Sequence, residues 1–120
     1  MAQILIIEDD TDFRDILKEL MEYQNYDVIV ASDGDEGFKM FLDNPTPLVI
    51  TDIFMPNREG MDLIFKFEQD FPDTKIIVIS GGGVVAGDYL KAASMVPNVK
   101  AAFEKPFDMD ELLQAVKEVL

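Results

Sequence analysis

Acidic side chains, one serine and one lysine follow the short apolar runs of this 120-residue chain. Glu8 and Asp9 follow the first run, Asp52 the third, Ser80 the fourth and Lys105 the fifth. If the three carboxylates lie close together, at least one pKa rises unless a cation lies among them. Oxygen ligands at a partly open site suit Mg²⁺ or Mn²⁺, which keeps coordination positions free for phosphate oxygens. The residues therefore predict phosphate chemistry assisted by a divalent metal.

Each polar side chain has a possible role in that chemistry. Asp52, at the centre of the cluster, would be the nucleophile and would form an acyl phosphate. Ser80 would donate a hydrogen bond from its hydroxyl to one phosphoryl oxygen. Lys105 would place a positive charge beside another.

The composition excludes several other kinds of function. The chain has no His and no Cys, so imidazole bases, thiol nucleophiles, disulfides and the usual zinc sites are excluded. A net charge of −14 argues against nucleic acid or an anionic membrane as the direct partner. No basic leader begins the chain, and no apolar run approaches the ~18 residues of a membrane span. We expect a cytoplasmic protein.

The elements that must position these residues alternate between strand and helix. Unbroken apolar runs predict buried strands over 4–7, 28–30, 48–50, 76–79 and 99–103. Helical spacing of apolar residues predicts helices over 13–21, 35–42, 63–67, 88–94 and 109–120, the first capped by Asp10 or Thr11 and the last by Asp108.

Five βα units in series predict an α/β fold with a doubly wound, five-stranded parallel sheet. We expect the flavodoxin-like (βα)5 arrangement as a single domain over residues 1–120, with strand order 2-1-3-4-5. In that order the first and third strands are neighbours, so Glu8, Asp9 and Asp52 converge at the carboxyl edge, where ligands bind to open α/β sheets.

The whole chain closely resembles the receiver domain of two-component response regulators, of the chemotaxis-regulator kind. The matching positions are Glu8-Asp9, Asp52 with Met55-Pro56 and Gly60, Ser80-Gly81, and Lys105-Pro106-Phe107. The resemblance implies the role of each site residue: Asp52 as phosphoacceptor, Asp9 as a direct Mg²⁺ ligand, Glu8 as a ligand through water, Phe54 as a ligand through its backbone carbonyl, Ser80 as the switch hydroxyl and Lys105 as the phosphate-pairing lysine. It also implies a cis peptide bond between Lys105 and Pro106.

The same resemblance implies the function. Asp52 would receive a phosphoryl group from a phosphohistidine on a sensor histidine kinase or a histidine phosphotransfer protein. Since this chain has no histidine, the donor must lie in another molecule or be a small phosphodonor. Phosphorylation would then change contacts with a downstream effector protein or domain. The chain would catalyse only its own phosphorylation and dephosphorylation.

Two departures from the family pattern concern how the phosphorylated state is transmitted. Ala102 stands where the family usually has an aromatic residue, three positions before the lysine. Phe103 comes one place later and, by strand alternation, should point to the opposite face of the sheet. Residues 95–98, Met-Val-Pro-Asn, replace the Gly-Ala step that is common after the fourth helix.

Two other functions remain open at the level of sequence. An aspartyl-nucleophile phosphatase typically has a second acid two residues after the nucleophile, and that position is Phe54 here. A flavin-binding module or a pseudo-receiver would only bind partners. A flavin-type phosphate loop is not expected where Glu8, Asp9 and Asp10 repel phosphate, whereas failure to bind Mg²⁺ would favour the pseudo-receiver.

Overall fold

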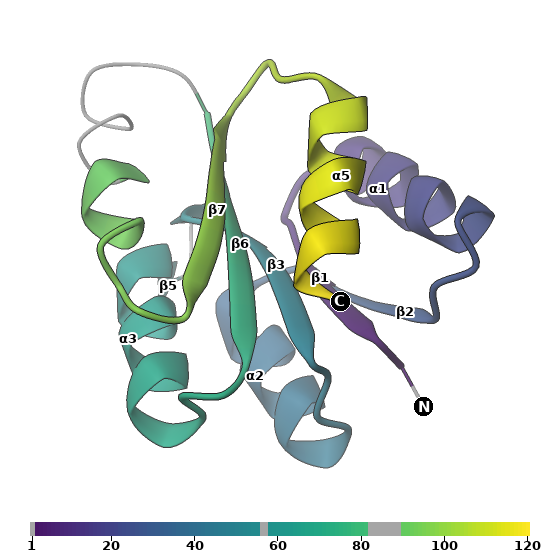
Figure 1. The fold of residues 1–120 in the computed structure, drawn as a ribbon. Coiled ribbons are helices and arrows are strands. Elements are labelled where there is room, and N and C mark those ends of the chain that lie inside the picture. The colour runs from purple at the N-terminus through teal and green to yellow at the C-terminus, as the bar shows by residue number, and fades with distance from the viewer. Residues whose placement is uncertain (1, 56–57, 82–89) are drawn as a thin grey trace.

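A five-stranded parallel sheet forms the centre of the protein in a computed structural model that describes residues 2–55, 58–81 and 90–120, with backbone alone for 54, 55 and 58–60. The strands are β1 (Ile4–Ile7), β2 (Val28–Ala31), β3 (Leu48–Asp52), β6 (Lys75–Ser80) and β7 (Val99–Glu104). Their order is β2-β1-β3-β6-β7 (Figure 1). Since β6 and β7 are the fourth and fifth strands of this sheet, the predicted order 2-1-3-4-5 is confirmed.

The register brings the predicted site residues to one edge of the sheet. Ile7, the last residue of β1, pairs with Thr51 of β3, so Glu8 lies level with Asp52. Asp52 in turn pairs with Ile79 of β6, the residue before Ser80. Because all five strands are parallel, their polar carboxyl ends meet at the same edge.

Helices cover both faces of the sheet (Figure 1). They are α1 (Thr11–Tyr23), α2 (Gly34–Asp43), α3 (Gly60–Asp70) and α5 (Met109–Val119). Of the helix predicted over 88–94, residues 88 and 89 lie outside the described part of the chain, and 90–93 are helical. None of the helices within the described residues is both long and apolar enough to cross a membrane.

Aspartate side chains cap α1, α2 and α5 and determine where these helices begin. Asp10 accepts hydrogen bonds from the backbone N–H groups of Asp12 and Phe13, which decides between the two predicted caps of α1. Asp108 caps α5 as predicted. Asp33 caps α2, so this helix begins at residue 34 rather than 35. Such caps pair backbone donors that the first helical turn leaves unsatisfied.

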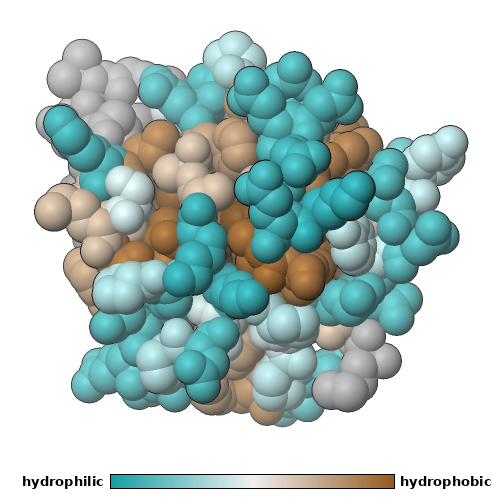
Figure 2. All heavy atoms as spheres, viewed as in Figure 1, coloured by the Kyte–Doolittle hydropathy of each residue, from teal (hydrophilic) through white to brown (hydrophobic). Residues whose placement is uncertain are grey.

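The sheet separates two groups of apolar side chains. On one face, buried side chains of β1, β3 and β6 pack against residues of α2 and α3 such as Phe41 and Phe67. On the other face, buried side chains of the same strands pack against residues of α1 and α5 such as Leu17 and Leu112. On the face of the molecule shown in Figure 2, hydrophobic side chains gather toward the middle and hydrophilic ones lie around them.

A small second sheet lies between β3 and α3 in the sequence. The two-residue strands β4 (Phe54–Met55) and β5 (Arg58–Glu59) pair in antiparallel register. Strands this short have no hydrophobic periodicity that could reveal them in the sequence. Pro56, part of the family resemblance, lies outside the described residues.

Candidate functional site

Three carboxylates converge at the carboxyl edge of the sheet, as predicted. One carboxylate oxygen from each of Glu8, Asp9 and Asp52 lies within 4.8 Å of the other two. Glu8 and Asp52 are almost fully buried, with side chains only 2% and 6% exposed, whereas Asp9 is exposed. The cluster therefore has two fixed, dehydrated acids and one that faces solvent.

Glu8 is held in place from several directions. Its backbone N–H donates to the carbonyl of Ala31, at 3.0 Å, and extends the pairing of β1 with β2. Its Oε2 accepts a hydrogen bond from the backbone N–H of Asp10, at 3.1 Å. The guanidinium of Arg14 donates to the carbonyl of Glu8, also at 3.1 Å. Arg14 has no role in the sequence prediction, because a side chain that binds a backbone carbonyl produces no sequence motif.

Lys105 reaches the same edge from the end of β7. Its Nζ donates to Oε1 of Glu8 at 2.9 Å and to Oδ2 of Asp52 at 3.0 Å. Its backbone N–H donates to the carbonyl of Ser80 at 2.7 Å, and its bond to Pro106 is cis, as the resemblance implied. The structure thus brings the predicted lysine into direct contact with two of the three predicted acids.

Burial and charge act in opposite directions on the ionisable groups of the site. Burial raises the pKa of Glu8 to about 7, although the hydrogen bond from Lys105 acts to lower it. Burial alone would lower the pKa of Lys105, but its hydrogen bonds to Glu8 and Asp52 outweigh burial and raise that pKa. Without a further cation, the edge therefore favours a charged lysine beside a carboxyl group that is partly protonated near neutral pH.

Ser80 and Phe54 lie on the segments that flank Asp52. Ser80 is fully buried at the end of β6, and its hydroxyl donates to the carbonyl of Gly81 at 3.1 Å. Phe54 begins β4, two residues after Asp52, with one residue between the two strands. These positions are compatible with the predicted hydroxyl and carbonyl roles, which remain predictions.

Phe13, the first residue of the helix predicted over 13–21, also lies at the site. The Nζ of Lys105 lies over its ring, 4.4 Å from the centroid. The ring is carried by the first turn of α1, immediately after the acidic segment. A phenylalanine at helical spacing gives no sequence signal that separates a cation contact from ordinary core packing.

The donor set fits a hard divalent cation. Three oxygen donors within 4.8 Å of one another, two of them fixed by burial, match the preference of Mg²⁺ for carboxylates and water. The described residues of this edge supply no nitrogen or sulfur ligand of the kind that zinc selects. The residues present therefore fit the metal that the sequence predicted.

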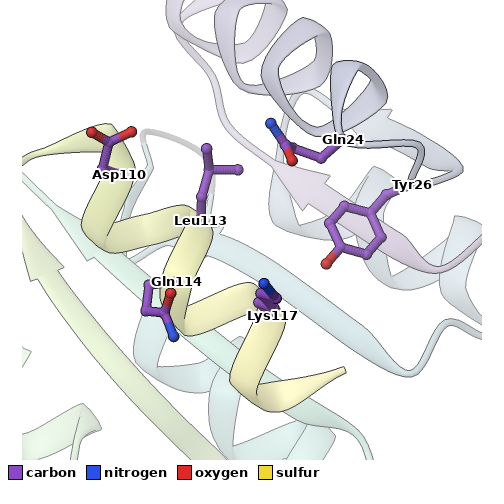
Figure 3. Close-up of a pocket in the computed structure, with 6 residues that line it drawn as sticks. All are labelled: Gln24, Tyr26, Asp110, Leu113, Gln114 and Lys117. Carbon is purple, nitrogen blue, oxygen red and sulfur yellow. The ribbon is translucent and has the colours of Figure 1, made fainter.

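A hollow lies away from this edge, between the end of α1 and one face of α5 (Figure 3). The side chains that line it are Gln24, Tyr26, Asp110, Leu113, Gln114 and Lys117. None of them is a predicted site residue. This hollow therefore has no part in the predicted phosphate chemistry.

The doubly wound sheet, with acids and a lysine at its carboxyl edge, defines the class of phosphoacceptor signalling domains. The response regulator receiver domain family matches residues 4–117, and the chain belongs to that family. It is accordingly a receiver domain of the response regulators of two-component systems. Domains of this class are signalling modules rather than classical enzymes.

Curated relatives align with the whole chain. The response regulator receiver protein CpdR of Brucella abortus is 32% identical over 120 residues, which are 98% of its length. The transcriptional regulatory protein CpxR of Escherichia coli is 32% identical, and the response regulator ArlR of Staphylococcus saprophyticus is 31% identical. The aligned parts are only 50% of CpxR and 53% of ArlR, so the chain spans about half of those two relatives.

Solved structures agree with the fold. The response regulator protein TrrA of Thermotoga maritima, solved in complex with Mg²⁺-BeF, is 30% identical, with a TM-score of 0.86 and complete coverage of both chains. A response regulator receiver domain protein from Clostridium thermocellum is 29% identical, with a TM-score of 0.87 over 99% of this chain and 94% of the other.

Proposed function

We propose that Asp52 is the phosphoacceptor of this receiver domain and that residues 1–120 act as a single unit. The donor is a phosphohistidine on a sensor histidine kinase or a histidine phosphotransfer protein. The bond between phosphorus and the imidazole nitrogen breaks as a carboxylate oxygen of Asp52 bonds to phosphorus, and the donor keeps the electron pair. The observation that carries the proposal is the convergence of Glu8, Asp9 and Lys105 on Asp52.

The proposed metal is Mg²⁺, with Mn²⁺ as a substitute. Asp9, Asp52 and the backbone carbonyl of Phe54 would hold it directly and Glu8 through water, and the convergence of the three carboxylates supports this assignment. When bound, the metal supplies positive charge that offsets the charge on phosphate oxygens. A neighbour solved with Mg²⁺-BeF supports the choice of metal.

The other side chains of the edge respond to the new phosphoryl group. Lys105, already 3.0 Å from Asp52, pairs with a phosphoryl oxygen. Ser80 turns its hydroxyl from the carbonyl of Gly81 toward another oxygen, because a phosphoryl group is the stronger acceptor. The resulting rearrangement at the carboxyl end of β6 alters contacts with an effector protein or domain. A cytoplasmic location belongs to the proposal and rests on the family assignment.

The proposal is tested by mass spectrometry of chains incubated with acetyl phosphate and Mg²⁺. We expect one added phosphoryl group on the wild type and none on Asp52→Asn. Asp73→Asn, which changes an exposed aspartate outside the cluster, is the matched control and should label like the wild type. Equal labelling of Asp52→Asn would refute the assignment.

The same preparation discriminates the alternatives. Absence of Mg²⁺ binding by the wild type would favour a pseudo-receiver that only binds partners. Steady hydrolysis of many equivalents of a phosphomonoester would favour an aspartyl phosphatase. For the receiver we expect Mg²⁺ binding and no such turnover.

A further inference from the structure

The ammonium group of Lys105 has an aromatic neighbour besides Glu8 and Asp52. Nζ lies over the ring of Phe13, 4.4 Å from its centroid, which is within the ~6 Å over which an aromatic face attracts a cation. We propose that Phe13 is a positioning residue: its ring holds the Lys105 ammonium where it must pair with the phosphoryl group on Asp52. This inference rests on the proposed function.

Phe13 is held in place both through its backbone and through its ring. Its backbone N–H donates to Asp10 at 3.2 Å, so the cap of α1 determines its height above the sheet. Its ring meets Phe107 edge-to-face, with centroids 6.1 Å apart and planes at 82°. Phe107 packs in turn against Phe103, at 5.4 Å. An anchored ring can orient the lysine, whereas a mobile ring could not.

The acidic cluster cannot position the lysine by itself during phosphoryl transfer. Lysine is a compact charge on a flexible four-carbon stem, and the side chain of Lys105 is 27% exposed. Glu8 and Asp52 hold it in the resting site, yet the proposed function engages both carboxylates elsewhere. The ring contact is independent of those carboxylates, so it persists when they turn away.

An uncharged aromatic face suits this place better than another acid would. The ring attracts the ammonium through its quadrupole without adding net negative charge. A fourth carboxylate beside Glu8, Asp9 and Asp52 would repel the incoming phosphoryl group. Phe13 therefore holds the ammonium group of Lys105 in place without increasing the repulsion that the incoming phosphoryl group meets at the site.

Ordinary apolar packing is the competing explanation. Phe13 lines a mostly apolar hollow. The other residues that line it are Lys105, Pro106, Phe107 and Met109. If packing were its whole role, leucine would replace it with little effect on the lysine. If the aromatic face matters, Phe13→Tyr keeps the function and Phe13→Leu does not.

The first test observes the contact itself by NMR of the metal-free protein, without any reaction. Protons of the Lys105 side chain beside Nζ should be shifted upfield by the ring current of Phe13. The shift should disappear in Phe13→Leu and persist in Phe13→Tyr. Lys18, in an exposed ion pair with Glu22, is the internal reference and should not change. A Lys105 shift that is the same in Phe13→Leu would overturn the inference.

The second test measures labelling of Asp52 by acetyl phosphate in chains with fluorinated phenylalanines placed at position 13 alone. Each added fluorine weakens the aromatic face with little change in shape. The rate should fall in steps, to about one fifth for the trifluorinated ring. The same series at Phe38, whose ring centroid lies 4.2 Å from the ammonium of Lys66 and outside the site, is the matched control and should leave the rate unchanged.

The outcomes of the second test separate this inference from the proposed function. A wild type that takes no label at Asp52 overturns the proposed function. A labelled wild type with a flat series at position 13, or an equal fall at position 38, overturns the positioning role alone.

Discussion

Replacing Lys105 with methionine should destabilise the metal-free protein, because two buried carboxylates then lose their shared cation. The Nζ distances are 2.9 Å to Glu8 and 3.0 Å to Asp52, whose side chains are 2% and 6% exposed. Removing one partner of a buried ion pair typically costs ~3–5 kcal/mol. Lys105 is itself 27% exposed and Glu8 can take up a proton, so we expect a loss of about 2–3 kcal/mol. Methionine keeps most of the apolar stem, so the loss reports charge rather than packing.

The assay is urea unfolding followed by circular dichroism at pH 7.5 in the presence of EDTA. Lys18→Met is the matched control, since it breaks an exposed pair with Glu22 at 3.1 Å and should cost less than ~0.5 kcal/mol. Asp52→Asn should be at least as stable as the wild type, because it removes one negative charge from a cluster with three acids and one lysine. A Lys105→Met chain within 0.5 kcal/mol of the wild type would refute the electrostatic reasoning, as would an equal loss in Asp52→Asn.

Other predictions concern the pH dependence and the packing around the site. In the metal-free protein the pKa of Glu8 is raised from 4.5 to about 7, so the folded state holds its proton longer and the free energy of unfolding should fall as pH rises from 4.5 to 7. Glu8→Gln should flatten that slope in urea titrations repeated at each pH. In Gly37→Ala the new Cβ would lie 2.5 Å from Cδ1 of Ile7, which should cost ~1–2 kcal/mol in urea unfolding. Gly81→Ala, whose Cβ meets nothing within 4 Å, should leave stability unchanged in the same assay. Asp10→Ala removes the cap of α1 and should lower the free energy of unfolding by ~1 kcal/mol.

The three central strands β1, β3 and β6 could be predicted because they are buried on both faces of the sheet. A run such as Ile4-Leu5-Ile6-Ile7 has no polar alternation, and the whole of it is buried in β1. The alternation of strands with helices predicts that the strands are parallel. Once the first and third strands are neighbours in a parallel sheet, Glu8 and Asp52 must lie at the same edge. Predicted boundaries differ from the structure by up to three residues: β3 extends two residues further, to Asp52, and α3 extends three residues beyond the prediction at each end.

What could not be predicted depends on tertiary contacts. The pairing of β4 with β5 requires only two residues on each side, too few for a pattern. The guanidinium of Arg14 donates a hydrogen bond to the backbone carbonyl of Glu8. Every residue has a backbone carbonyl, so the sequence does not reveal which one an arginine binds. The ring of Phe13 looks in sequence like any apolar residue of an amphipathic helix. A sequence shows the chemical type of each side chain. The roles of Arg14, of Phe13 and of the β4–β5 pairing depend instead on where the fold places them.

The separation of the apolar interior by the sheet has a consequence for how this chain can change over time. Leu17 packs on the face covered by α1 and α5, and Phe67 packs on the face covered by α2 and α3. Substitutions that share no neighbours contribute independently to stability. A lineage can therefore repack one face to suit a new protein partner while the other face keeps its ancestral packing.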